Sequence, residues 1–137
     1  MAGQRGRDIL LKIADGIGGF ETLAGIRASR VRLNAGLVDG TSAESDEAWR
    51  ELVAGAGVKA AQVSGRGVFK DAASDERMRA VFFAGQIVGW RLVLPGFGAL
   101  VGLFQISELQ WSGAHDGEAE FSVTLESAGR VDFEVQA

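Results

Sequence analysis

The stretch Lys59–Gly85, KAAQVSGRGVFKDAASDERMRAVFFAG, contains the patterns that decide the fold. Alternating apolar residues over positions 59–69 predict one long strand, which a short connector joins to a helix. Glycines interrupt this strand at Gly65 and Gly67. Glycine inside a strand is typical of a bulge or of a close approach by another backbone. We therefore expect a second segment of the chain to pass close to this strand.

The second half of the stretch predicts a helix over residues 74–85. Ser74 is in position to cap its first turn, where acidic residues follow. Gly85 is expected to end it. The apolar stripe of the helix has the spacing i, i+3, i+4 and consists of Met78, Val81 and Phe82. In a chain rich in strands, such a stripe must pack on a sheet, because no other element offers an apolar surface.

The remainder of the chain predicts further strands and tight turns. Twenty glycines and one proline suit that architecture. Strands are expected over residues 8–13, 20–33, 88–94 and 99–112, followed by a final hairpin with strands 118–126 and 130–136. The apolar phase slips by one residue near residues 28–30 and near Ser107, which predicts a bulge at each place. Trp49 and Leu52 are expected to bring the chain back to the body.

The expected final hairpin has one apolar face and one wet face. Carboxylates dominate the wet face: Glu118, Glu120, Glu126, Asp132 and Glu134. Charge is also distributed unevenly along the chain, since residues 1–32 carry six basic and three acidic side chains and residues 112–137 carry one and six. Two ends of a chain with opposite net charge either pair with each other within the folded domain or face a neighbouring molecule.

Composition indicates a single domain over residues 1–137, because a chain of this length buries roughly two-thirds of its unfolded surface. There is no cysteine, so neither a disulfide framework nor thiolate chemistry is expected. The apolar runs are too short to cross a bilayer, and the N-terminal residues lack the features of a signal peptide. We therefore expect synthesis in the cytoplasm, no association with a membrane, and release from the cell by lysis.

Catalytic patterns are scarce. The single histidine, His115, lies in a glycine-rich turn without a second histidine or a cysteine to complete a transition-metal site. The acids between Asp39 and Asp46 resemble a calcium loop in composition only, since their spacing does not match. We expect no enzymatic activity, no metal and no cofactor. A hydrolase is disfavoured, whereas a small-molecule-binding β-barrel remains an alternative to a structural role.

Several blocks of the sequence carry a resemblance to a known family. They are Trp49-Arg-Glu51, the pattern V-S-G-x-G-V-F-x-D over residues 63–71 and the pattern F-S-x-x-L-E-S-x-G-x-V-x-F over residues 121–133. In this respect the chain resembles the major tail tube proteins of long-tailed, non-contractile bacteriophages and of phage-derived gene transfer agents. The resemblance implies a mainly β fold, a two-sheet sandwich or partial barrel flanked by one short helix and carrying a long loop.

The resemblance also implies a function and partners. Such proteins form six-membered rings that stack into a virion tail tube, through which DNA leaves the capsid without specific binding. Given such a tube, the acids of the wet face, Glu118, Glu120, Glu126, Asp132 and Glu134, are candidate lumen-facing acids. The implied partners are further copies of the chain and other tail proteins, namely the tape measure, terminator and distal tail proteins. The implied location is the tail of a virion or of a gene transfer agent.

The polar segment 34–47 is expected to be a long loop, and loops of that length in compact domains are usually functional or disordered. By resemblance it contacts the neighbouring ring, with candidate stacking residues Asp39, Thr41, Ser42, Glu44, Asp46 and Glu47. Their expected basic partners on the neighbouring subunit are Arg5, Arg7, Arg27, Arg30 and Arg32. A disordered surface loop is the alternative.

Overall fold

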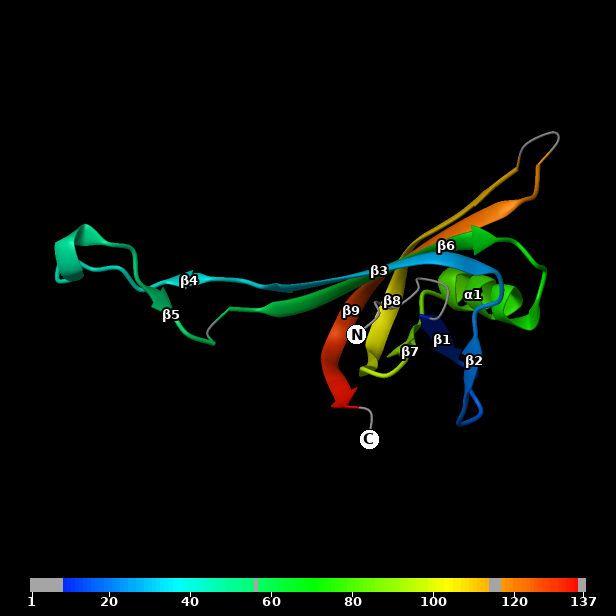
Figure 1. The fold of residues 1–137 in the computed structure, drawn as a ribbon, viewed down its shortest axis with the longest axis horizontal. Helices are drawn as coiled ribbons and strands as arrows, with labels where there is room; N and C mark the ends of the chain where they lie inside the picture. The colour runs from blue at the N-terminus through cyan, green and yellow to red at the C-terminus, as the bar shows by residue number, and fades with distance from the viewer. Residues whose placement is uncertain (1–8, 56, 114–116, 136–137) are drawn as a thin grey trace.

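The fold is known from a computed structural model, which describes residues 9–55, 57–113 and 117–135. One seven-stranded antiparallel sheet with the order β2-β1-β7-β8-β9-β6-β3 forms the body, and a two-stranded ribbon, β4-β5, lies away from it (Figure 1). The strands are β1 (Leu10–Ala14), β2 (Phe20–Thr22), β3 (Ile26–Ala35), β4 (Val38–Asp39), β5 (Leu52–Val53), β6 (Lys59–Val68), β7 (Ile87–Leu94), β8 (Gly98–Ser112) and β9 (Glu120–Val135). The helices are α1 (Ala73–Ala84) and a short 3-10 turn, η2 (Asp46–Ala48).

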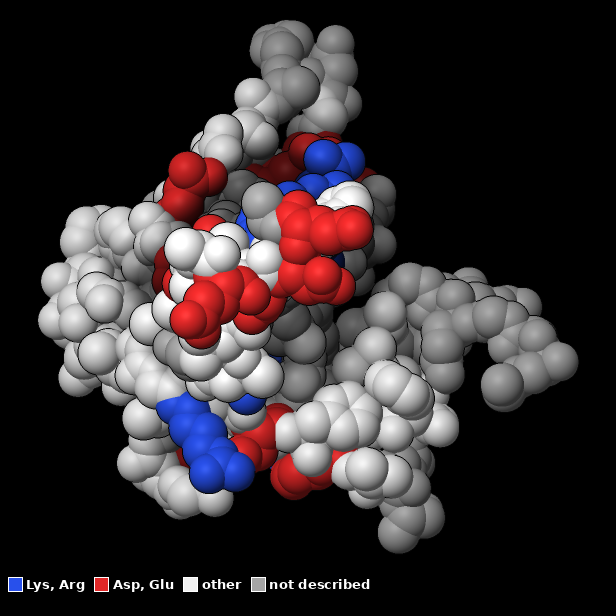
Figure 2. Space-filling view, turned by 90° about the vertical axis from the view of Figure 1, so that its left-hand side faces the viewer, with Lys and Arg blue, Asp and Glu red and all other residues white. Residues whose placement is uncertain are grey.

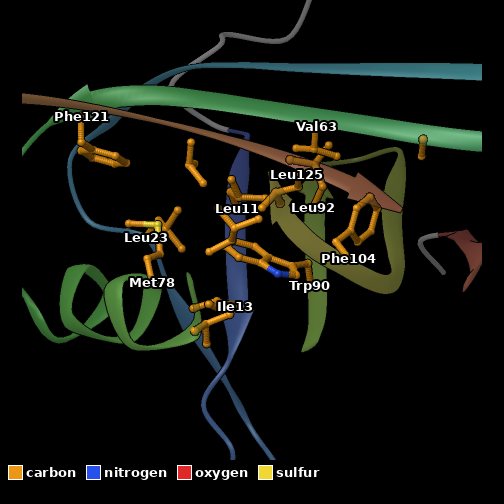
Figure 3. Close-up of a cluster of buried hydrophobic side chains, with 14 residues drawn as sticks. Leu11, Ile13, Leu23, Val63, Met78, Trp90, Leu92, Phe104, Phe121 and Leu125 are labelled. Atoms are coloured by element: carbon orange, nitrogen blue, oxygen red, sulfur yellow. The ribbon is translucent and has the colours of Figure 1, made fainter. Parts of the chain in front are cut away.

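The sheet curls around one core, and α1 lies against its concave side (Figure 1). Trp90 of β7 and Leu125 of β9 are among the fully buried side chains of this core (Figure 3). In the described residues the end strands β2 and β3 do not pair with each other, so the barrel stays open. The expected mainly β partial barrel with one flanking helix is confirmed.

The close approach predicted for the glycines of β6 is found at Gly67. A Cβ atom at this position would lie 2.0 Å from the carbonyl oxygen of Gly25. The same oxygen accepts a hydrogen bond of 2.9 Å from the N–H of Val68. The connection between β2 and β3 is therefore attached to the end of β6, and only glycine leaves room for it.

The helix begins and ends close to the expected positions, but its cap differs. The N–H of Ala72 donates to the Asp75 carboxylate at 2.9 Å, so Asp75 supplies the carboxylate at the first turn. Ser74 is buried, and its hydroxyl accepts the N–H of Ala24 at 3.1 Å. The expectation that Ser74 caps the helix is therefore wrong, because tertiary contact takes its hydroxyl. Gly85 ends the helix in the left-handed conformation, as expected.

The apolar stripe of α1 is narrower than expected. Met78 and Val81 are fully buried, whereas Phe82 is 37% exposed and Phe83 is 75% exposed. Phe82 thus lies at the border of the helix–sheet contact, because the curled sheet covers only the side of the helix that Met78 and Val81 occupy. The two phenylalanine rings contact each other edge to face, with centroids 5.7 Å apart.

This arrangement predicts unequal costs for two truncations. Met78→Ala should lower the free energy of unfolding by about 2–5 kcal/mol, because it leaves a cavity under the helix. Phe82→Ala should cost only about 1 kcal/mol, since much of the ring already contacts water. Chemical denaturation of the two variants measures both values. Equal losses would show that Phe82 supports the core as much as Met78 does.

The predicted strand 20–33 is divided in two. The chain turns at Leu23–Gly25, where Gly25 has φ +76°, and the N–H of Leu23 donates to the carbonyl of Leu11 at 2.9 Å. Leu23 is buried at this turn, whereas Phe20 is 42% exposed. The expected bulge is present, since the register with β6 shifts between Ile26 and Ala28.

The predicted final hairpin is also wrong, because β9 is one continuous strand that pairs with β8 along its length. Gly102 pairs with Val131 and Phe104 with Ser127, so Leu103 faces the whole Ala128–Arg130 segment. The residues expected to form a turn are therefore absorbed in a wide bulge. They can remain extended because β8 is long enough to pair on both sides of them. The bulge predicted near Ser107 is confirmed by the register shift between Ile106 and Glu108.

Candidate assembly surfaces

The expected loop 34–47 is part of a hairpin arm that projects from the body. β3 and β6 pair as far as Ala35 and Lys59, and the chain then continues through β4, η2 and β5 (Figure 1). We call residues 36–55 and 57–58 the arm. The expectation of an irregular loop is corrected, because regular pairing of β3 with β6 and of β4 with β5 carries the chain outward.

The arm combines exposed apolar side chains with carboxylates. Its exposed large apolar residues are Leu37, Val38, Trp49, Leu52, Val53 and Val58. Trp49 is 71% exposed and Leu52 is 47% exposed. The expectation that these two residues return the chain to the body is therefore wrong. Figure 2 views the molecule from the side on which the arm projects and shows red carboxylates gathered there. A projecting tryptophan surrounded by aliphatic residues is typical of an interface residue.

Short-range hydrogen bonds shape the tip of the arm, by which we mean residues 39–51. The Asp39 carboxylate accepts the N–H of Thr41 at 2.8 Å, and the Thr41 hydroxyl accepts the N–H of Glu51 at 2.7 Å. The Ser45 hydroxyl accepts the N–H of Ser42 at 2.9 Å. Hydrogen bonds from Thr41 hold the pKa of Asp39 below its usual value. The bond from the Thr41 side chain has the larger effect, and the bond from its backbone N–H comes second. All the predicted stacking residues belong to this tip and are exposed.

Of the expected basic partners, Arg30 and Arg32 can be placed. They lie on β3 opposite Ser64 and Gln62 of β6, on the face of the sheet turned away from the core, and both are exposed. Arg5 and Arg7 lie outside the described residues, and the side chain of Arg27 is not described.

The candidate lumen-facing acids are all exposed, but they do not form one group. Glu126 of β9 accepts a hydrogen bond of 2.7 Å from the side chain of Gln62, on the same face of the sheet as Arg30 and Arg32. Glu120 lies on this face too, and Glu118 precedes the strand. This face therefore carries charges of both signs.

The other two acids lie beyond the wide bulge of β9 and have arginine partners. Asp132 is 2.6 Å from Nε of Arg130, and Glu134 is 3.1 Å from Arg91. These pairs are exposed, and such pairs usually contribute less than about 1 kcal/mol. They nevertheless reduce the net negative charge at this end of β9.

Several strand edges in the described part of the chain have no neighbour, among them the outer edges of β2 and β3 and residues 131–135 of β9, which pair with β8 alone. β3 ends the sheet, and the pairing of β7 with β8 stops at Gln105, so residues 106–112 of β8 pair with β9 alone. Exposed edges of this length can pair with another chain. The β3 edge contains Arg30 and Arg32, while Glu108 lies on the β8 edge, so the edges differ in charge.

The described residues contain no group of histidine, cysteine and carboxylate side chains that could hold a metal ion. None of the helices in this part of the chain is long and apolar enough to cross a membrane. Its main surface features are instead a projecting arm and open strand edges. These features define a structural subunit that associates with other protein chains.

Comparison with known proteins identifies the family. The family model described as phage tail tube protein matches residues 3–133. The chain therefore belongs to the phage tail tube protein family, and it is a structural tail tube subunit rather than an enzyme. A comparison with curated proteins gave no match.

Three solved structures are similar to the chain. A chain in the tail of an empty gene transfer agent particle, refined with C6 symmetry, has 46% identity and a TM-score of 0.91, with 97% of this chain and all of that chain covered. A chain of the native gene transfer agent virion has 45% identity and a TM-score of 0.89 with the same coverage. The SPP1 tail tube protein has 14% identity and a TM-score of 0.69 over 93% of this chain and 76% of its own, which shows the shared fold.

Proposed function

We propose that the chain forms six-membered rings that stack into a tail tube, through which DNA passes from the capsid to the host cell. The observation that carries the proposal is the arm, whose exposed Trp49 and aliphatic residues have no place in the body of their own subunit. The C6 symmetry of the similar gene transfer agent tail supports the number of subunits in a ring.

We assign ring closure to two of these open edges, β3 and residues 106–112 of β8. If β3 of one subunit pairs with residues 106–112 of β8 in the next, each subunit gives one edge and takes one. Such a heterologous contact closes into a ring when the rotation between subunits allows it. The charge difference between the two edges favours one order of edges.

The arm would make the contact between rings, with its tip against the next ring. Arg30 and Arg32 remain the candidate partners for the acids of the tip. Exposed ion pairs contribute little, so we assign most of the binding free energy to the apolar residues of the arm. Burial of these residues in the contact between rings would explain why apolar side chains are found so far from the core.

Electron microscopy of the concentrated, purified protein tests the proposal. Rings with six subunits, or tubes built from them, are the expected result. A stable monomer that retains a small molecule inside the barrel would contradict it and support the alternative of a ligand-binding barrel. The packed side chains of the core in Figure 3 give no support to that alternative.

In the particle, we propose that the tube contacts the tape measure inside it and the terminator and distal tail proteins at its ends. Assembly would take place in the bacterial cytoplasm, with release of the particle by lysis. DNA would pass through the lumen without sequence-specific binding.

The lumen is proposed to be lined by the wet face of β9, where Glu120 and Glu126 lie. Changing both residues to lysine should leave tubes intact but reduce DNA delivery, because added basic side chains hold phosphate by releasing counterions. Delivery by assembled particles and tube morphology would be measured together. Normal delivery by intact double-variant particles would mean that these acids do not face the DNA. Glu134 is a poorer choice because its change to lysine also breaks the contact with Arg91.

A further inference from the structure

An acidic pocket of about 380 Å³ lies where the first turn of α1 meets the outer end of β8. Three of the described residues that line it are carboxylates, namely Asp71, Asp75 and Glu76, whereas Arg79 is the only cation among them. Phe69 and Trp111 form apolar walls, and Trp111 is 45% exposed. Two of its lining residues, Trp111 and Ser112, belong to the open edge of β8, whereas its carboxylates lie on neither the arm nor an open edge.

Asp75 shows that the pocket lacks a partner. The residue is 4% exposed, and its Oδ2 is engaged by the N–H of Ala72. Its other oxygen, Oδ1, is buried without any hydrogen-bond donor. A buried carboxylate oxygen without a donor is costly, and native proteins usually satisfy such atoms. Because Asp75 lines the pocket, a donor that enters from outside would remove this cost once the carboxylate turns toward it.

The chemistry of the walls selects the class of donor. An excess of carboxylates next to an exposed indole suits an arginine, whose planar guanidinium stacks on aromatic faces and donates to carboxylates in pairs. The carboxylates are not arranged as a metal site, as far as the described residues show. An anionic or purely apolar ligand would meet unfavourable charge or leave Oδ1 unpaired.

We propose that this pocket binds the arginine side chains of residues 1–8, MAGQRGRD, from a neighbouring copy of the chain. Arg5 and Arg7 are separated by one residue, so an extended backbone presents both on one side. This segment carries two arginines and one acid, whereas residues 37–53 of the arm carry five acids and one arginine. Charge complementarity thus selects the N-terminal segment and disfavours the arm.

The sheet register explains why the donor is a neighbour. The described chain begins next to β1, where Leu10 pairs with Val93 and Val93 pairs with Ala99 at the start of β8. The pocket includes Trp111 and Ser112, at the far end of the same strand. A segment that leaves one end of the subunit and a pocket at the other end make a heterologous contact, which propagates along a stack. Only the choice of a second copy as donor rests on the proposed self-assembly.

A peptide with the sequence MAGQRGRD and a fluorescent label at its C-terminus tests the pocket directly. The acceptor is the full-length chain with Arg5→Gln and Arg7→Gln, so that its own arginines do not compete. Fluorescence anisotropy at low ionic strength should show saturable binding. Adding Asp71→Asn and Glu76→Gln to the acceptor should weaken binding at least about tenfold. Asn tolerates the positive φ of Asp71, and circular dichroism would verify that the helix persists.

Two controls identify the binding groups. A peptide with glutamine in place of both arginines should bind at least about tenfold more weakly. Glu44→Gln with Glu47→Gln neutralises as many carboxylates on the arm and should leave the affinity unchanged. The proposal is overturned if no binding occurs, if the pocket variant binds as well as its parent, or if only the arm variant loses affinity. Tubes without peptide binding would overturn the pocket alone, whereas peptide binding without rings or tubes would overturn the proposed function alone.

Discussion

Replacing residues 38–53 with a short Gly-Ser turn should abolish long tubes while leaving a folded subunit. The deleted part packs on nothing in the body, and the pairing of β3 with β6 ends before it begins. Circular dichroism and the midpoint of chemical denaturation should therefore stay close to those of the parent. Electron microscopy should show subunits or single rings in place of tubes. Tubes of normal length would show that the arm does not carry the contact between rings.

Point variants should separate the two chemistries of the arm. Trp49→Ala with Leu52→Ala should shorten tubes severely, because burying a large apolar side chain contributes about 1.5–3 kcal/mol. Glu44→Gln with Asp46→Asn should have a smaller effect, since an exposed ion pair contributes less than about 1 kcal/mol. Six-fold repetition in a ring multiplies both differences. If the charge variant shortens tubes more than the apolar variant does, the charged residues contribute most of the binding free energy between rings.

Gly67→Ala should be among the most destabilising single substitutions in the chain. Its Cβ would lie 2.0 Å from the carbonyl oxygen of Gly25, which is backbone and cannot rotate away. The β2–β3 connection must move, and the hydrogen bond that Val68 donates to Gly25 is then lost. We expect a loss of roughly 3 kcal/mol in the free energy of unfolding, a large part of the stability of a small domain.

Gly113→Ala is the matched control for this substitution. Apart from Gly113 itself and its chain neighbours, no atom of the described residues lies within 4 Å of the position that its Cβ would occupy. The same chemical change there should alter the free energy of unfolding by less than about 0.5 kcal/mol. If Gly67→Ala is as well tolerated as Gly113→Ala, the β2–β3 connection is not held against β6 as described.

Local sequence determined the strand alternation, the end of the helix and the positions of two bulges, because each depends only on residues close together in the chain. The alternating residues of β6 and β7 and the glycine that ends α1 all reflect period and backbone freedom. The bulges near Ala28 and Ser107 follow from phase slips, which are visible without knowledge of the partner strand. The sequence blocks at residues 49–51, 63–71 and 121–133 by themselves indicate the tail tube family.

Tertiary structure decided what depends on a partner distant in sequence. The Ser127–Gly129 stretch has the composition of a turn, but the length of β8 keeps it extended within β9. Ser74 suits a helix cap, but the N–H of Ala24 engages its hydroxyl. Trp49 was expected in the body because it is apolar, yet paired strands carry it outward. The unpaired oxygen of Asp75 appears only when α1 packs on the sheet, because local sequence sets which groups are present and packing sets which of them find partners.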